Sequence, residues 1–435
     1  MELQVRRWKD LSQTEQNRFL ARSELDISSI SSSIEEIVET VRTNGDEALR
    51  SYTLTLDKVD ISGKPLRVEQ SEIDAAESKL DTKIRQAIDH AIQNVTKFHK
   101  SQVPGAGPFM EIQAGVMAAE RHSPIDSVGL YVPRGRGSFP SMVYMQTIPA
   151  KLAGVPRIVL VTPPEKDGSV DPAVLYAAAV TGVDEIYRIG GPHAIAALTF
   201  GTESLPRVLK IQGPGSMYVT AAKRLLSNHI DIGMPAGPSE SIILADKTAD
   251  PYTTALDLII EAEHGSDSSA ILISTSEPVA EAVAEIIPDL IEEIEEPRRT
   301  FLQDVFNNYG GIFLASSLQE GAEIVNEFAP EHLQIRTSEP WATAGLIRNA
   351  SEILLGEHIP FSIANYITGP NAVLPTGGNA KTFSPLGVRD FMKSSSIIYL
   401  EPTGYSALSQ AVIDLADHEG FPAHSKAIRD RNRSL

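Results

Sequence analysis

The sequence predicts an α/β fold with parallel sheets, and three observations carry this prediction. Short apolar runs alternate with helical stretches through the middle of the chain, an alternation typical of parallel sheets. The N-terminal third is rich in helical patterns, and the Pro/Gly-rich segment 234–239 separates two α/β units. The predicted strands are 127–132, 157–162, 185–189, 241–245, 270–274 and 311–314, with helices at 144–154, 172–181, 194–202 and 253–263 between them.

Two N-terminal helices follow from apolar residues at helical spacing. The first begins after a serine cap and covers 32–41, and the second covers about 82–99 with one apolar stripe. We read both stripes as packing faces without chemistry. From about Gly404 the chain forms a separate helical appendage that ends in the basic residues Lys426, Arg429, Arg431 and Arg433.

The composition excludes several classes of protein. The 435 residues include 38 basic and 57 acidic side chains, a net charge of −19, which argues against a nucleic-acid binder. The length suggests two or three domains, and 42% apolar residues can fill their cores. The chain lacks cysteine, so disulfides, thiolate metal sites and a cysteine nucleophile are excluded. With no long apolar run, we expect a soluble, cytoplasmic protein.

Three segments combine titratable residues with a break in the apolar pattern. Glu261 and His264 are three residues apart at the end of a helix, which suits two ligands of one metal; the alternative is a solvated helix end. Glu331 and His332 follow a helix and a proline, where an imidazole could accept a proton and a carboxylate could activate water. The third segment is 418–424, which could act as a lid, as a contribution to a partner subunit, or as plain surface.

Three loops are candidates for binding anions. Gly190-Gly191-Pro192-His193 follows a strand and opens a helix, like half of a dinucleotide fingerprint, and Gly213-Pro214-Gly215-Ser216 precedes another helix. No complete G-x-G-x-x-G motif occurs in the chain. The basic turn Arg134-Gly135-Arg136 reads either as an anion clamp or as ordinary surface charge.

Taken in order, these segments resemble the histidinol dehydrogenase family over nearly the whole chain. The matching blocks are 127–133, Gly190-Gly191 with 194–198, 200–204, 213–215, 234–240, 262–265, 329–333 and 373–376. The resemblance implies two incomplete Rossmann-like domains with small helical terminal segments that reach across a homodimer. By the resemblance, residues 1–27 form an N-terminal helical arm, 28–130 and 237–386 the first α/β domain, 131–236 the second, nucleotide-side domain, and 387–435 a C-terminal tail.

The resemblance also implies an enzyme that uses one zinc ion per subunit and NAD to take a primary alcohol through an aldehyde to a carboxylate. In the family this is L-histidinol to L-histidine, in histidine biosynthesis. His332 is similar to the family's base and Glu331 to the residue that activates water. The expected zinc ligands are Glu261, His264, Asn365 and His424. Substrate contacts are expected from Ser141, Ser239 and Glu419, with Arg134 and Arg136 nearby, and NAD contacts from Tyr131, His193 and Ser216.

Several positions depart from the family pattern. Glu261 stands where the family has glutamine and Asn365 where it has aspartate, so carboxylate and amide are exchanged. Ala372 replaces a substrate-side histidine, and His193 and Ser216 replace a glutamine and an asparagine near NAD. The reaction class should survive these changes, but the substrate could be another small alcohol, for example an anionic one such as a sulfopropanediol. A third alternative is a homologue that binds without catalysis.

Overall fold

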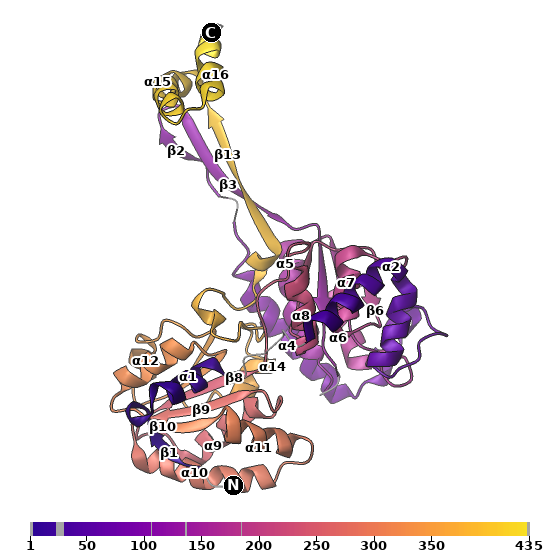
Figure 1. Ribbon diagram of the computed structural model, residues 1–435, viewed down its shortest axis with the longest axis vertical. Helices are drawn as coiled ribbons and strands as arrows, with labels where there is room; N and C mark the ends of the chain where they lie inside the picture. The colour runs from indigo at the N-terminus through magenta and orange to yellow at the C-terminus, as the bar shows by residue number, and fades with distance from the viewer. Residues whose placement is uncertain (1–2, 23–29, 106, 135–136, 184, 433–435) are drawn as a thin grey trace. The chain divides into compact units, whose positions relative to one another are not determined.

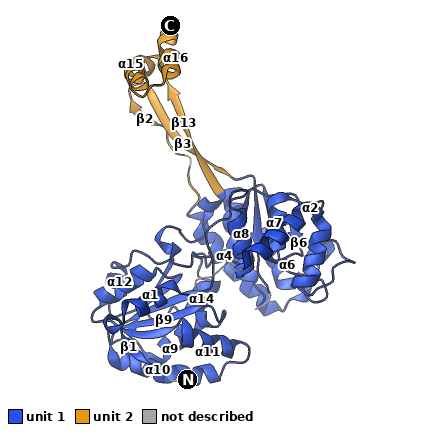
Figure 2. Cartoon of the chain, viewed as in Figure 1, with its two compact units in different colours: residues 1–102, 125–391 blue, residues 103–124, 392–435 orange. Residues whose placement is uncertain are grey.

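The computed structural model describes residues 3–22, 30–105, 107–134, 137–183 and 185–432. These form two compact units, Met1–Gln102 with Ile125–Phe391, and Val103–Pro124 with Met392–Leu435 (Figure 2). The larger unit holds two parallel sheets with their helices, which confirms the predicted α/β class (Figure 1). None of the described helices is both long and apolar enough to cross a membrane.

The larger sheet has six parallel strands in the order β1-β10-β9-β8-β11-β12. Its strands are β1 (Val5–Arg7), β8 (Glu240–Ala245), β9 (Ser269–Ser274), β10 (Gly311–Leu314), β11 (His332–Arg336) and β12 (Glu352–Leu355). Its helices are α1 (Gln13–Ala21), α9 (Pro251–Ala262), α10 (Glu277–Glu292), α11 (Arg298–Asn308), α12 (Leu318–Phe328), α13 (Pro340–Ala344) and α14 (Phe361–Tyr366). Alternate β8 residues enter two different hydrophobic cores, one with α9 and α10 and one with α1 and α12, because successive strand residues face opposite sides.

The second sheet has four parallel strands in the order β6-β5-β4-β7. These are β4 (Ser127–Tyr131), β5 (Arg157–Val161), β6 (Glu185–Tyr187) and β7 (Lys210–Gln212). The helices around it are α2 (Ser31–Leu56), α3 (Gln70–Asp74), α4 (Thr82–Lys100), α5 (Pro140–Ala153), α6 (Pro172–Thr181), α7 (Gly191–Phe200) and α8 (Met217–Leu226). All six strands predicted from the sequence are present in the two sheets, within one or two residues at their ends.

The N-terminal segments join the sheets differently from the expected grouping. The expectation placed 28–130 with 237–386, but α2 shares its hydrophobic core with α7 and α8, and α4 packs on α5. The arm at 1–27 is not purely helical, since β1 pairs with β10 and Phe19 of α1 packs edge-on against Phe313. An apolar helix face shows that a helix is buried but not which sheet covers it, so the pattern could not assign α2 and α4.

The smaller unit is built from two distant parts of the chain. β13 (Met392–Leu400) pairs antiparallel with β3 (Val116–Pro124), and β3 pairs with β2 (Met110–Gln113). Helices α15 (Pro402–His418) and α16 (Pro422–Asn432) follow. The segment 387–435, expected as a C-terminal tail, thus contains strand β13 and two helices, and residues from before β4 complete the unit.

Candidate active site

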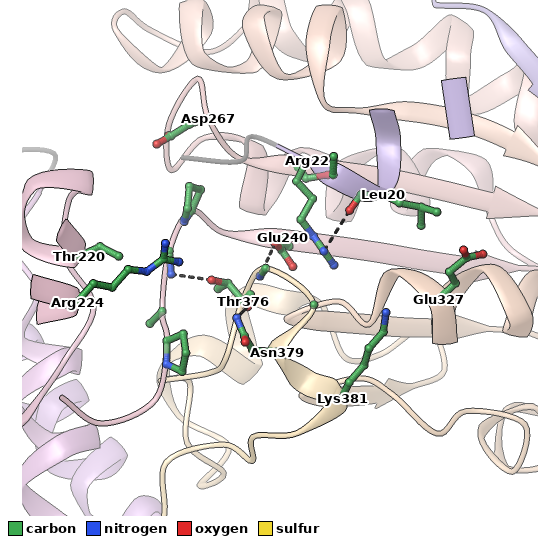
Figure 3. Close-up of a pocket in the computed structure, with 18 residues that line it drawn as sticks. Leu20, Arg22, Thr220, Arg224, Glu240, Asp267, Glu327, Thr376, Asn379 and Lys381 are labelled. Carbon is green, nitrogen blue, oxygen red and sulfur yellow. Dashed lines mark hydrogen bonds and ion pairs between the residues drawn. The ribbon is translucent and has the colours of Figure 1, made fainter. Parts of the chain in front are cut away.

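A cavity of about 560 Å3 opens beside the start of β8 in the larger unit (Figure 3). Its wall includes Glu240 of β8, Arg22 after α1, and the loop Gly377-Gly378. Glu240 is almost fully buried, and its backbone N–H donates a hydrogen bond of 3.0 Å to Oε2 of Glu331. The cavity thus adjoins the carboxylate that the sequence singled out.

The titratable residues cluster at the amino ends of the strands. Glu240, His332 and Glu352 are the first residues of β8, β11 and β12, and Glu331 immediately precedes β11. His332 lies directly opposite Glu352 in the parallel register of β11 and β12. Ligands of open α/β sheets normally bind at the carboxyl ends of strands, whereas this cluster lies at the opposite edge of its sheet.

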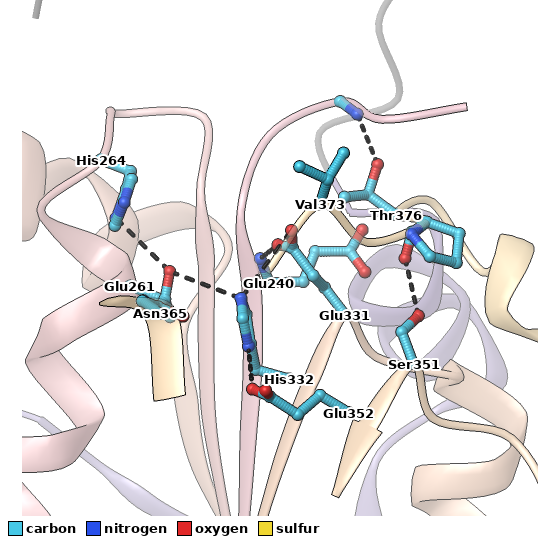
Figure 4. Close-up of polar contacts among 12 residues, drawn as sticks. Glu240, Glu261, His264, Glu331, His332, Ser351, Glu352, Asn365, Val373 and Thr376 are labelled. Atoms are coloured by element: carbon cyan, nitrogen blue, oxygen red, sulfur yellow. Dashed lines mark hydrogen bonds and ion pairs between the residues drawn. The ribbon is translucent and has the colours of Figure 1, made fainter. Parts of the chain in front are cut away.

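His332 is a buried imidazole surrounded by carboxylates (Figure 4). Its Nδ1 lies 2.8 Å from Oε2 of Glu352, and its Nε2 lies 3.8 Å from Oε1 of Glu331 and 4.0 Å from Oε2 of Glu261. Burial alone would lower the pKa of His332, but the three carboxylates outweigh it and raise the pKa to about 10. Glu352 fixes the proton on Nδ1, which turns Nε2 toward the other two carboxylates.

Glu331 is a buried carboxyl group with an unusual proton affinity. Burial raises its pKa to about 8, although the neighbouring His332 acts in the opposite direction. The turn that presents it begins where α12 ends, at Ala329 with a left-handed φ of 54°, followed by Pro330. A carboxyl group that titrates near neutral pH is suited to accepting a proton from water.

The predicted metal ligands of this unit come together at the end of α9. Asp250 caps the start of α9 by accepting from the N–H of Thr253, and the helix ends one residue after Glu261. His264 therefore lies beyond the helix, yet its Nδ1 is 3.4 Å from Oε2 of Glu261. Asn365 of α14 donates to Oε1 of Glu261 at 2.7 Å.

The electrostatics of this group favour a charged carboxylate. Burial would raise the pKa of Glu261, but His332 and His264 outweigh it and lower the pKa below its ordinary value. The Oδ1 atom of Asn365 is buried without a hydrogen-bond partner among the described residues. No group of three or more histidine, aspartate or glutamate side chains is placed to hold a metal ion within the described ranges. At the end of α9 only two such side chains, Glu261 and His264, lie together, and the third neighbour is the amide of Asn365.

Comparison with known proteins decides the family. Residues 20–432 match the family model "Histidinol dehydrogenase". The chain is 46% identical over 419 residues to "Histidinol dehydrogenase" of Synechocystis sp., covering 96% of each chain, and 47% identical over 422 residues to a "Histidinol dehydrogenase homolog" of Rhizobium meliloti, covering 97% of this chain and 92% of the relative. The chain belongs to the histidinol dehydrogenase family. The crystal structure of histidinol dehydrogenase from Elizabethkingia anophelis matches with a TM-score of 0.92 at 32% identity, covering 100% of this chain and 98% of the other.

Membership in this family of oxidoreductases confirms the resemblance seen in the sequence. The remaining expected substrate residues fall in different places. Ser141 is buried in the first turn of α5, and Ser239 directly precedes β8, where its carbonyl accepts from the N–H of Ser269. Glu419 and His424 belong to the smaller unit, at the end of α15 and in α16, and both are exposed.

Arg134 does not have the environment expected of an anion clamp. Its guanidinium forms an ion pair with Glu165, with Nε 2.8 Å from Oε1, and donates to the carbonyl of Pro164 at 3.2 Å. A carboxylate of the protein itself thus occupies the bidentate face that would bind an anionic substrate. Arg136 lies outside the described residues.

The expected NAD residues lie at the carboxyl ends of the four-stranded sheet. Tyr131 ends β4, and its hydroxyl accepts from the N–H of Gly191 at 3.2 Å. Ser216 is exposed and stands at the N-cap position of α8, without a capping hydrogen bond from its side chain. His193, by contrast, is fully buried, and its Nε2 lies 3.4 Å from Oγ1 of Thr53. It therefore packs inside the protein behind the glycine loop and is not exposed at this edge. Burial lowers the pKa of His193 to about 3, which keeps it neutral.

Sequence reasoning missed two residues of the site, Glu240 and Glu352. Glu240 stands at the end of a block that matched the family, so its position carried a signal that was not used. Glu352 has no local signal, because only the parallel register of β11 and β12 places it opposite His332.

Proposed function

We propose that this protein oxidises a primary alcohol through an aldehyde to a carboxylate with NAD as the acceptor, and that L-histidinol is its substrate. The observation that carries the proposal is the buried Glu331–His332 pair, with Glu352 holding Nδ1 of the imidazole. One group suited to moving an alcohol proton and one suited to activating water stand next to each other, as two successive oxidations require.

His332 serves the hydride steps by taking the alcohol proton on Nε2 in its neutral form, which becomes accessible once a bound cation offsets the charge of Glu261, one of the carboxylates that raise its pKa. The hydrogen bond from Nδ1 to Glu352 orients the ring and stabilises the imidazolium that forms. Its ring packs edge-on against Phe361, 5.8 Å between centroids, which limits rotation about the side chain.

Glu331 serves the second half of the reaction. With a pKa of about 8 it can take a proton from the water that adds to the aldehyde carbonyl, which leaves the anion of a gem-diol. Loss of hydride from this anion to a second NAD gives the carboxylic acid. This route needs no cysteine, in agreement with a chain that has none. The N–H of Glu240 fixes Oε2 of Glu331, so one carboxylate oxygen is oriented and the other can face the water.

The residues at the end of α9 fit a zinc ion by their donor chemistry. Glu261, His264 and Asn365 would hold it, together with His424 from a second copy. These four ligands carry one formal negative charge. The buried Oδ1 of Asn365 has a lone pair available for the metal. Zinc bound there would supply a Lewis acid for the alcohol oxygen and offset the charge of Glu261 beside His332. The C-terminal end of α9 also favours a cation.

The carboxyl edge of the four-stranded sheet fits NAD. β4 lies between β5 and β7, so the strand order reverses there, which is where nucleotides bind in such sheets. The loop at Gly213 has a left-handed φ of 120°, and a Cβ there would lie 2.1 Å from the carbonyl of Tyr131, so only glycine permits this close turn. The starts of α7 and α8 offer backbone N–H groups to a pyrophosphate.

The charges around His332 favour a cationic substrate. The carboxylates of Glu261 and Glu352 lie beside His332 and can accept hydrogen bonds from a cationic group. Glu240 already pairs with Arg22, and Arg134 with Glu165. The ammonium group of an amino alcohol such as L-histidinol suits this environment, whereas a sulfonate or phosphate would meet carboxylates.

A second candidate is another small alcohol. It is favoured by Ala372, where the family has a histidine, and by relatives whose printed names read only "Histidinol dehydrogenase homolog".

We further propose that a second copy completes the site. The smaller unit has few buried side chains and exposes apolar ones, with Met110, Ile398 and Leu415 each more than 60% exposed. A homodimer that exchanges this unit would cover them and bring Glu419 and His424 to the partner's site. Sedimentation should show a dimer, and charged substitutions at Ile398 and Leu415 should dissociate it and abolish activity together.

The test of the proposed function is NAD reduction by purified, zinc-loaded protein with L-histidinol and a panel of small polyols and amino alcohols. We expect L-histidinol to give the highest kcat/KM. A higher value for another alcohol would reassign the substrate. No NADH with any alcohol, together with no bound zinc, would favour a binding protein without catalysis.

A further inference from the structure

Arg22, directly after α1, is a buried cation that neither the fold nor the chemistry above explains. Its side chain is only 10% exposed, and its backbone has a φ of 59°, a conformation that side-chain-bearing residues rarely adopt. It lines the cavity beside β8, where Figure 3 shows its side chain extending toward Glu240. A charged residue held in this conformation and removed from water requires compensating contacts.

The first set of contacts leads from Arg22 through Glu240 to Glu331. Nε of Arg22 lies 2.7 Å from Oε1 of Glu240, which also accepts from the N–H of Gly377 at 2.8 Å. The backbone N–H of this same Glu240 donates to Oε2 of Glu331. The ion pair thus fixes the residue whose main chain orients the water-activating carboxylate.

The second set leads from Arg22 to the turn before Glu331. The guanidinium donates to the carbonyl of Phe328, lies 3.4 Å from that of Ala329, and stacks 3.8 Å over the ring of Phe328. Ala329 is itself in the left-handed region, two residues before Glu331. Arg22 therefore stabilises the end of α12 in the conformation that leads into Pro330-Glu331-His332.

We propose that Arg22 is a positioning residue for Glu331, acting through Glu240 on its carboxylate and through Phe328 and Ala329 on its backbone. This inference rests on the proposed role of Glu331 in activating water. It gives the N-terminal segment a function in the second oxidation.

Electrostatics agree with this geometry. Burial raises the pKa of Glu240 to about 7, and Arg22 opposes that rise. Without the guanidinium, Glu240 would be a buried carboxyl group lacking its counter-ion next to the carboxylate of Glu331. Such a group protonates or moves, and either change shifts the N–H that holds Glu331.

The test compares the two half-reactions in Arg22→Met, Arg22→Lys and a control, Arg7→Met. Arg7 pairs with Glu277 at 2.9 Å, with both side chains about half exposed, so its loss removes an ion pair away from the site. We expect Arg22→Met to lower kcat for aldehyde oxidation by about 10- to 100-fold, the scale of a small misplacement of a reacting group. Alcohol oxidation should fall far less, KM should change little, and Arg22→Lys should recover part of the loss. Arg7→Met should match the wild type.

Glu331→Gln in the same assays distinguishes an error in the proposed role of Glu331 from an error in the proposed role of Arg22. If Glu331→Gln does not selectively lower aldehyde oxidation, the role of Glu331 is wrong. If it does, and Arg22→Met lowers both half-reactions equally or neither, the inference on Arg22 alone is overturned. Should Arg22→Met not fold, Arg22→Lys carries the test, because it keeps the charge but loses the paired carbonyl contacts; a proportional loss in both half-reactions would then contradict the proposal.

Discussion

The two parallel sheets of the larger unit present their polar residues at opposite edges. The six-stranded sheet gathers Glu240, Glu331, His332 and Glu352 at the amino ends of its strands, beside the C-terminal end of α9. The four-stranded sheet places its glycine loops at the carboxyl ends, beside the starts of α7 and α8. Helix C-termini attract cations and helix N-termini attract anions, so one edge suits zinc and an ammonium group and the other suits a pyrophosphate.

A buried histidine at each edge shows the same contrast. Carboxylates outweigh the effect of burial at His332 and raise its pKa to about 10, whereas burial alone lowers the pKa of His193 to about 3. The Nε2 atom of His193 lies 3.8 Å from Oδ2 of Asp57. The ring of His193 also packs against Tyr52 and Thr53. Burial lowers the pKa of both histidines, and the surrounding carboxylates account for the difference between them.

Substituting the two histidines should separate these roles most strongly. We expect His332→Asn to lose about 10²- to 10⁴-fold in kcat for alcohol oxidation, the usual contribution of a general base. His193→Gln, which introduces the residue that the family resemblance implies at this position, should keep kcat within about twofold. Steady-state kinetics with L-histidinol measures both. Comparable losses in the two variants would break the contrast between the edges.

The next largest effect is expected on zinc affinity, when the carboxylate of Glu261 and the amide of Asn365 are substituted. Glu261→Gln leaves no anionic ligand at the proposed zinc site, so we expect metal affinity to fall by at least about 10- to 100-fold. Adding Asn365→Asp should restore part of it, because the double variant has the arrangement that the resemblance implies for the family. Elemental analysis after dialysis measures zinc per subunit. An active enzyme without metal, or a double variant with no recovery, would show that the two positions do not compensate.

The pKa of Glu331 predicts the pH dependence of the second half-reaction. The ionised carboxylate is the form that accepts a proton from water. The rate of aldehyde oxidation should therefore rise with pH up to about 8, and fall about tenfold per unit below that value. In Glu331→Gln the remaining rate should lose this dependence. A midpoint near 4.5, the ordinary value of glutamate, would contradict the effect of burial.

The smallest effect is expected at Arg134. Because Glu165 already binds its guanidinium, Arg134→Ala should change kcat/KM for the true substrate by less than about twofold. A larger change that depends on an anionic group of the substrate would restore the anion-clamp interpretation.

Much of the fold was readable from the sequence, because buried parallel strands are short apolar runs and their helices carry apolar stripes. β1, with three residues, is too short to show a pattern. The smaller unit escaped detection because β13 is largely exposed and β3 is mostly only half-buried, so neither shows a clear apolar pattern. In addition, their paired residues are at least 268 positions apart (Met392 with Pro124), which no local signal can indicate.

The site was predicted where adjacent residues carry it and missed where topology creates it. Glu331 and His332 are neighbours in sequence, so a motif could indicate them. Glu352 depends on the register of two strands, and Arg22 reaches Phe328 across 306 residues. The ion pair of Arg134 with Glu165 could not be seen in the sequence either, because Glu165 is 31 residues away in the loop after β5.

The most direct test of the central claim is the stoichiometry of NADH formed from limiting L-histidinol. The account predicts two NADH per L-histidinol for the zinc-loaded wild type, because His332 and Glu331 serve two successive oxidations. It predicts about one NADH, with aldehyde accumulating, for Glu331→Gln on the same timescale. One NADH from the wild type, or two formed as fast by Glu331→Gln, would contradict the division of labour between these residues.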